Sequence, residues 1–188
     1  AGDTLVPQAL DVIHQHLHTH LLSDLMYADS SHGRSGRFEE VSEVRRPGWS
    51  PERLRSQCYV GDTLIATAQL VNAAGGISLL ADLHEHDRAL RLSERASNIS
   101  RIAELLTVSQ QDRLLPTASL RAVQEHCLRV GIDAECTMPH SVPVVRVSRR
   151  LATSPKISVI IPTRGTVETV RGNKMVLAAH AISTLLNA

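Results

Sequence analysis

Aromatic residues are scarce in this chain, and several other features that would point to a class of function are missing with them. Phe, Trp and Tyr make up 2% of the 188 residues, so we expect a core of aliphatic side chains. A surface that stacks RNA bases needs aromatic platforms, and the composition argues against one. The formal net charge is +1, which gives the chain no overall attraction to nucleic acid or to a membrane surface.

Cysteine patterns and long apolar runs are also missing. The three cysteines, Cys58, Cys127 and Cys136, do not have the CxxC spacing of a zinc site. We therefore expect reduced thiols, no disulfide framework and a cytoplasmic location. The apolar runs are too short to span a membrane, and because the chain opens on a polar turn we expect no signal peptide. Because Ala1 takes the place of an initiator Met, we expect a processed chain or a fragment.

Hydrophobic residues at 43% and charged residues at 21% are typical of a chain that folds around a core. The length allows one domain, or one domain and a piece of another. Helical and strand patterns alternate, which favours a three-layer α/β arrangement with a mostly parallel sheet. The predicted helices are 7–22, one capped by Ser50, one ending at Gly75-Gly76, 84–96, 116–131 and 173–187. The predicted strands are 25–28, a segment ending near Ala66, a segment containing Val145 and Val147, and 156–163, with 98–108 as a buried apolar segment.

The stretch SPKISVIIPTRGT, residues 154–166, has the pattern of a buried parallel strand that runs into a glycine turn. Nucleotide-binding α/β domains often begin in this way, and Thr163 and Arg164 lie where such a turn cradles a diphosphate. No GxGxxG or P-loop follows, so the pattern by itself is a weak nucleotide signal. A small α/β protein that binds another phosphate ligand is one hypothesis.

The run HQHLHTH suggests a metal site at first sight. On a helix with about 100° per residue, His14 and His18 lie on one flank and His16 and His20 on the other. Each pair offers a metal at most a weak site, and the four rings cannot converge. We interpret them as solvent-facing side chains of an amphipathic helix.

Acidic residues occur at several element boundaries. Asp3 precedes the first helix, Asp29 ends a strand, Asp62 follows another predicted strand, and Glu85 and Asp87 open a helix. Ligand groups in α/β sheets gather at strand ends, which makes Asp29 a candidate, although a turn role explains it as well. A carboxylate at a helix start is usually a cap, which is the simpler reading of Asp87.

Longer strings in a fixed order carry a family resemblance. PGWSPERLRSQCYVG and DRALRLSER are the most specific, and GDTLVPQAL, SDLMYADSS, NAAGG, ISRIAELL and KISVIIPTRGTVETVRGNKMVLAAHAISTLL occur around them. Together they resemble the family-two inverting glycosyltransferases of the GT-A fold, in particular long bacterial proteins with tandem transferase domains. The match covers nearly the whole chain.

The resemblance implies an incomplete GT-A-like arrangement in three parts. Residues 1–112 would be the C-terminal half of one transferase domain, 113–153 a helix-strand linker region, and 154–188 the first strand and helix of the next domain. It also implies a nucleotide-sugar donor, a polysaccharide or glycolipid acceptor, other glycosyltransferase modules as partners, and a location in the cytoplasm or at the inner face of the membrane.

The resemblance also assigns roles to residues. Glu85 stands where the family has the Asp that deprotonates the acceptor hydroxyl. Asp3 and Asp29 would hold a divalent cation, Mg²⁺ or Mn²⁺, against the diphosphate, and Thr163 and Arg164 would bind the cofactor side. The acceptor-side residues would be Trp49, Gln57, Tyr59, Asp62 and Asp87.

Several positions depart from the family pattern. The acidic turn keeps Asp3 only, the motif at Asp29 loses two acids, Asp62 replaces a His, and 107–110 replace a segment with a His near the metal or phosphate. Two readings follow from these losses. The chain is part of an active glycosyltransferase with Glu85 as base, or it is a catalytically inactive scaffold or remnant.

Overall fold

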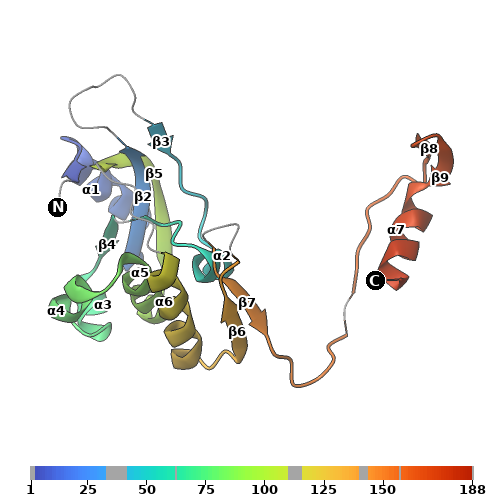
Figure 1. Cartoon of the computed structure of the whole chain (residues 1–188). Coiled ribbons are helices and arrows are strands. Elements are labelled where there is room, and N and C mark those ends of the chain that lie inside the picture. Colours follow the sequence, from blue (N-terminus) through green and yellow to red (C-terminus); the bar gives the residue numbers. More distant parts are fainter. Residues whose placement is uncertain are drawn as a thin grey trace. The chain divides into compact units, whose positions relative to one another are not determined.

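The computed structural model describes residues 3–32, 42–61, 63–109, 116–139, 144–156 and 158–187. The chain divides into two compact units, Ala1–Arg150 and Leu151–Ala188 (Figure 1). The first unit contains a five-stranded mixed sheet, a two-stranded sheet and six helices among its described residues. The second unit contains a two-stranded sheet and one helix in its described part.

Two long strands, β2 (Leu25–His32) and β5 (Ile99–Ser109), form the centre of the large sheet and run parallel. β1 (Thr4–Leu5) pairs with β5, and β3 (Ser42–Val44) and β4 (Leu64–Ala66) pair with β2, all antiparallel. The α/β class is confirmed, but the prediction of a mostly parallel sheet is wrong for the described strands. Parallel neighbours need a long crossover, and the helices between β2 and β5 provide it for that pair.

Helix α1 (Ala9–Thr19) packs on one face of the sheet. Successive strand residues point to opposite faces, so Met26 and Ala28 of β2 meet this helix together with Ile102 of β5. The helix presents Ala9, Val12, Ile13 and Leu17. Leu10 is 72% exposed, because the buried stripe is centred on Ala9 and Ile13.

The remaining helices of the first unit contribute to the core around Leu25 and Tyr27, which point away from α1. They are α2 (Pro51–Ser56), α3 (Ala68–Ala73), α4 (Ile77–Asp82), α5 (Glu85–Arg95) and α6 (Pro116–Arg129). The predicted cap is confirmed, since Ser50 Oγ accepts a hydrogen bond from the Arg53 amide at 3.3 Å. Gly131, with φ of 70°, ends α6 in the left-handed region as predicted.

The hairpin β6 (Ala134–Thr137) and β7 (Arg146–Arg149) follows α6 and pairs antiparallel. Val145 is buried in the same core as Tyr27 and Leu90, with Val147 packed against it. Val145 and Val147 therefore both face this core. Residues 116–150 are thus joined to the core of the first unit through α6 and this hairpin.

The second unit contains β8 (Val167–Val170), β9 (Asn173–Val176) and α7 (Leu177–Leu186). The prediction of a buried strand at 156–163 is wrong for its described residues, since none of them is in a strand and Ile160 is 90% exposed. A parallel strand needs neighbours on its sides and cover on its faces, and the described residues of this unit supply neither. The helix predicted from residue 173 begins at Leu177 because 173–176 pair with β8.

None of the helices in the described part of the chain is both long enough and apolar enough to cross a membrane.

Candidate functional site

Asp29 lies in the middle of β2 and is fully buried. The pairing of β2 with β5 shifts register on both sides of it, between Ala28 and Asp29 and between Asp29 and Ser30. Such bulges redirect a side chain and occur often near functional sites. The irregular pairing therefore falls at Asp29, the strand residue that the sequence pattern indicated as a candidate ligand group.

Both oxygens of the Asp29 carboxylate accept hydrogen bonds from arginines. Arg101 Nη2 is 2.9 Å from Oδ2 and 3.1 Å from Oδ1, and Arg45 Nη1 is 3.3 Å from Oδ2. The backbone amide of Arg46 donates to Oδ1 at 2.7 Å. We call Asp29, Arg45, Arg46 and Arg101 the Asp29 cluster.

Two opposing effects act on the acidity of Asp29. Burial alone would raise the pKa of this carboxyl, because a buried charge loses its hydration. The hydrogen bonds from Arg101, the Arg46 amide and Arg45 outweigh it and hold the pKa of Asp29 below its ordinary value. The carboxylate is thus ionised at neutral pH and is neutralised by guanidinium groups.

Asp3 and Asp29, the two expected metal ligands, are not brought together. Thr4 is opposite Val108 on β5, while Asp29 is opposite Leu105 on the other edge of the same strand. Asp3 and Asp29 are therefore two strands apart, about 10 Å across the sheet, and offset by roughly 10–13 Å along it. A divalent cation needs several oxygens at about 2–2.6 Å.

The described residues contain no group of three or more His, Cys, Asp or Glu side chains that could hold a metal ion. The oxygens of Asp29 are already occupied by arginine donors, and Asp3 is too far away to share a cation with it. The arrangement of the described residues does not fit the expected cation.

Glu85 is the first residue of α5, directly after the cap residue His84. It is partly exposed, and His84 Nδ1 accepts a hydrogen bond from the His86 amide. The positive end of the helix dipole stabilises a carboxylate at this position. Glu85 is thus a carboxylate with solvent access on a rigid element, which is what a base for a bound hydroxyl requires.

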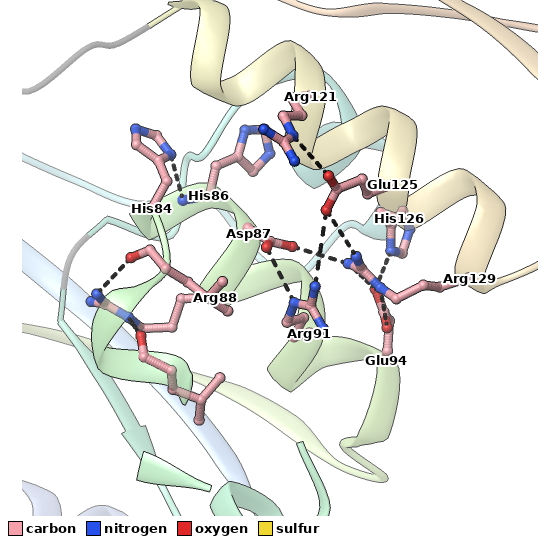
Figure 2. A network of polar contacts seen from close by, with 12 residues as sticks. His84, His86, Asp87, Arg88, Arg91, Glu94, Arg121, Glu125, His126 and Arg129 are labelled. Carbon is pink, nitrogen blue, oxygen red and sulfur yellow. Dashed lines mark hydrogen bonds and ion pairs between the residues drawn. The ribbon is translucent and has the colours of Figure 1, made fainter. Parts of the chain in front are cut away.

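Asp87, two residues further along α5, belongs to a polar network with α6 (Figure 2). Arg91 Nε and Arg129 Nη2 each donate to its carboxylate at 3.1 Å, and the side chain is 10% exposed. Arg129 also donates to Glu94, with Nη2 at 2.7 Å from Oε1. Asp87 therefore joins two helices in this structure, where the resemblance gave it an acceptor-side role.

His126 forms the buried end of this network. Its Nδ1 lies 2.7 Å from Glu94 Oε1, and its Nε2 accepts from Arg55 Nε at 3.2 Å, so the ring is held as the neutral Nδ1–H form. Burial lowers the pKa of His126, and the adjacent Glu94 carboxylate opposes this without reversing it. His126 of α6 therefore connects this helix with α5 through Glu94 and with α2 through Arg55.

The predicted acceptor-side residues Trp49 and Tyr59 pack with Tyr27 as an aromatic cluster. Their ring centroids are 6.0–6.4 Å apart. The Tyr59 hydroxyl accepts from the Ser50 amide at 2.7 Å, and the Tyr27 hydroxyl donates to the Pro47 carbonyl at 2.7 Å. These rings support the loop that leads into α2.

Gln57, the residue after α2, is half-buried. Its backbone amide donates a hydrogen bond to the Arg53 carbonyl at the end of that helix. A cavity of about 110 Å³ lies beside Trp49, Leu54, Glu94 and His126. At roughly 30 Å³ for each water, it has room for a few water molecules rather than for a sugar ring. A wider hollow of about 590 Å³ lies along α6 and β6, and none of the predicted site residues lines it.

Three predicted site residues lie elsewhere. Thr163 and Arg164 are exposed in the second unit, where Thr163 Oγ accepts from the Gly165 amide at 3.0 Å. Both belong to the second unit, whereas Asp29 and Glu85 belong to the first. Asp62 lies outside the described residues.

The histidine run has the predicted geometry. His14 and His18 contact each other on one flank, and His16 and His20 stack on the other with ring centroids 4.1 Å apart. The interpretation as solvent-facing side chains is wrong for His16, which is half-buried and reaches Ser100 Oγ at 2.8 Å, while the other three histidines are exposed.

Sequence reasoning missed the arginines around Asp29. Arg101 interrupts the apolar pattern ISRIAELL of β5, and a charged residue in such a segment signals a buried partner. Arg45 and Arg46 stand directly before the string PGWSP. The available signal was therefore an arginine in a core strand, facing an acid in the neighbouring one.

No family model matches the chain. Among curated proteins, the chain is 31% identical over 183 residues to the O-antigen biosynthesis protein RfbC of Myxococcus xanthus. The alignment includes 91% of this chain but only 14% of the relative's length. This chain is similar to one segment of a protein of polysaccharide biosynthesis.

Proposed function

We propose that this chain is part of a family-two glycosyltransferase that builds a bacterial polysaccharide such as O-antigen. The observation that carries the proposal is the 31% identity with the O-antigen biosynthesis protein over nearly the whole chain. The strings PGWSPERLRSQCYVG and DRALRLSER support the assignment to the family. The reaction would move a sugar from a nucleotide-sugar donor to a glycan acceptor, with inversion at the anomeric carbon.

In this proposal Glu85 is the base. Its carboxylate would take the proton of the acceptor hydroxyl as the oxygen attacks the anomeric carbon, while the nucleoside diphosphate leaves. The partial exposure of Glu85 at the start of α5 supports the role, since an acceptor has to reach it. Residues 1–112 would belong to one transferase domain and 154–188 to the next.

A non-catalytic scaffold is the second candidate, and specific contacts favour it. Asp29 and Asp87 are both bound by arginines of the same unit, and the Tyr59 hydroxyl is hydrogen-bonded to the backbone. These family positions are used here to hold elements together. A domain that kept its packing and lost its chemistry would show the same pattern.

The test is a chromosomal Glu85→Gln change in a bacterium that makes the whole protein. Glutamine keeps the size of the side chain but cannot accept the proton. We expect loss of the polysaccharide on gels of cell-surface glycan, with the protein still present at its normal level. Glu104→Gln is the matched control, because Glu104 is an exposed glutamate of β5.

The outcomes separate the two candidates. Loss of the polysaccharide in Glu85→Gln alone supports the transferase role. Normal polysaccharide in Glu85→Gln, together with loss on deletion of the segment, rejects Glu85 as base and favours the scaffold. Normal polysaccharide after deletion of the segment rejects both.

A further inference from the structure

We propose that Cys127 and Cys136 are a redox modification site, at which a small-molecule disulfide oxidises the two thiols to a reversible intramolecular disulfide. The sequence predicted reduced thiols, and all three cysteines are free in this structure. The proposal adds an oxidised state, in which the end of α6 is bonded to β6. It does not rest on the proposed function.

The two sulfur atoms already lie next to each other. Cys127 Sγ is 3.9 Å from Cys136 Sγ, within reach of a weak S–H···S hydrogen bond. A disulfide needs about 2.05 Å between its sulfurs, so the two atoms have to approach by roughly 2 Å. A change of rotamer at half-buried Cys136 moves its sulfur over such a distance. We therefore expect the bond to need a side-chain movement rather than a rearrangement of α6 or β6.

The backbone on both sides of the pair is held by hydrogen bonds. Cys127 lies in the last turn of α6, and its carbonyl accepts from the Ile132 amide at 2.8 Å, across the turn at Gly131. Cys136 lies in β6, opposite Val147 of β7. Thiols held close together in this way react with each other at a high effective concentration. The folded chain should therefore favour the disulfide more strongly than the unfolded chain.

A reagent can reach the pair through the hollow of about 590 Å³ along α6 and β6, which both cysteines line. Cys127 is 2% exposed and Cys136 is half-buried, so a reagent meets Cys136 first. The carboxylates of Asp133 and Glu135 also line the hollow and repel anions. Cystamine, a small cationic disulfide, is therefore the probe that suits this site.

The reaction is a thiol–disulfide exchange in two steps. The Cys136 thiolate attacks one sulfur of cystamine, the S–S bond of the reagent breaks, and cysteamine leaves as a thiolate. Cys127 then loses its proton to solvent and attacks the Cys136 sulfur, which releases the second cysteamine. The two cysteines lose two electrons and two protons, and cystamine takes them up as it becomes two thiols.

The surroundings of the pair set the rate of the first step. Burial, with a further contribution from the adjacent Cys127, raises the pKa of the Cys136 thiol to about 11. Only the thiolate attacks, so exchange should be slow at neutral pH and become about tenfold faster per pH unit up to pH 9. Fast redox sensors have cysteines with a lowered pKa. This pair should instead oxidise slowly, where disulfides predominate over thiols.

The experiment begins with the reduced 188-residue chain, which is incubated with cystamine, alkylated, digested with trypsin and analysed by mass spectrometry. Arg129 lies between the two cysteines, so trypsin separates them unless they are bonded. We expect residues 122–129 to appear linked to residues 130–146, with Cys58 still alkylated. The same digestion after incubation at pH 7, 8 and 9 measures the predicted increase in rate.

A second measurement tests whether the fold brings the thiols together. In buffers of cysteamine and cystamine, the equilibrium constant for the disulfide should be at least about tenfold larger in the folded chain than in concentrated urea. By the same linkage, oxidation should raise the melting temperature by roughly 3–8 °C.

The matched control is Cys58→Ala, which removes the third cysteine of the chain and is also half-buried. It should give the same linked peptides and the same equilibrium constant. If this variant fails to fold, the linked peptides of the unchanged chain still identify the pair. A bond to Cys58, a cysteamine adduct on Cys136 that does not close, or equal constants in the folded chain and in urea would each overturn the proposal.

Discussion

The two units use similar apolar patterns with different results. In the first unit, the described leucines of α5 are buried, and Leu90 is 1% exposed. In the second unit, α7 has the same kind of apolar content, yet Leu185 is 50% exposed and no described residue of the unit is buried. An apolar stripe specifies a helix, but it contributes to stability only where another layer covers it.

The largest effect that separates the units should come from cavity formation. We expect Leu90→Ala to lower the free energy of unfolding by about 2–5 kcal/mol, because the cavity in the core cannot collapse fully. Leu185→Ala, the same change on α7, should alter it by less than about 0.5 kcal/mol. Urea denaturation followed by far-UV circular dichroism measures both, and equal losses would mean that α7 is covered as well as α5.

A smaller effect should appear as a pH dependence of the stability of the first unit. The pKa of His126 is lowered in the fold by burial, so the unfolded chain binds a proton near pH 6.5 that the folded chain does not. The free energy of unfolding should therefore be highest above pH 6.5. It should fall as the pH drops below that value, by at most about 1.4 kcal/mol per pH unit for this group.

The groups that face His126 are Glu94 of α5, Arg129 of α6 and Arg55 of α2. The Glu94 pKa is lowered, because burial, which would raise it, is outweighed by Arg129 and His126, so Glu94 remains ionised across this range. His86 also has a lowered pKa caused by burial and adds a slope of the same sign. His126→Gln should reduce the slope of the free energy of unfolding between pH 7 and 5.5, and an unchanged slope would contradict the role given to His126.

The smallest effect should come from an exposed contact of the first unit. Glu52 accepts from Arg55 at 2.7 Å and from Arg149 at 2.6 Å, and its side chain is 65% exposed. Glu52→Gln should cost less than about 1 kcal/mol, because water competes for these charges. The same denaturation assay, repeated at high salt, should show the difference shrink further. A loss as large as that of Leu90→Ala would contradict the view that burial separates the two units.

The candidate site was predictable in part. The strand residues 25–28 and the helix that begins at Glu85 followed from apolar periodicity, but the prediction that Asp29 ends its strand is wrong, since β2 continues to His32. The arginine partners of Asp29 and Asp87 could not be predicted in this way, since Arg101 lies 72 residues from Asp29 and Arg129 lies 42 residues from Asp87. Local patterns do not carry such long-range pairings.

By itself the sequence determined the elements that depend on local chemistry. Ser50 caps a helix, Gly131 ends one, and the four histidines divide into two flanks, because each depends on residues within about one turn. The tertiary structure alone decided that the sheet is mixed, that Asp29 holds arginines, and that residues 158–163 do not form a strand. Pairing direction, ion partners and burial depend on what lies next to a segment in space, and that is set only when the layers pack.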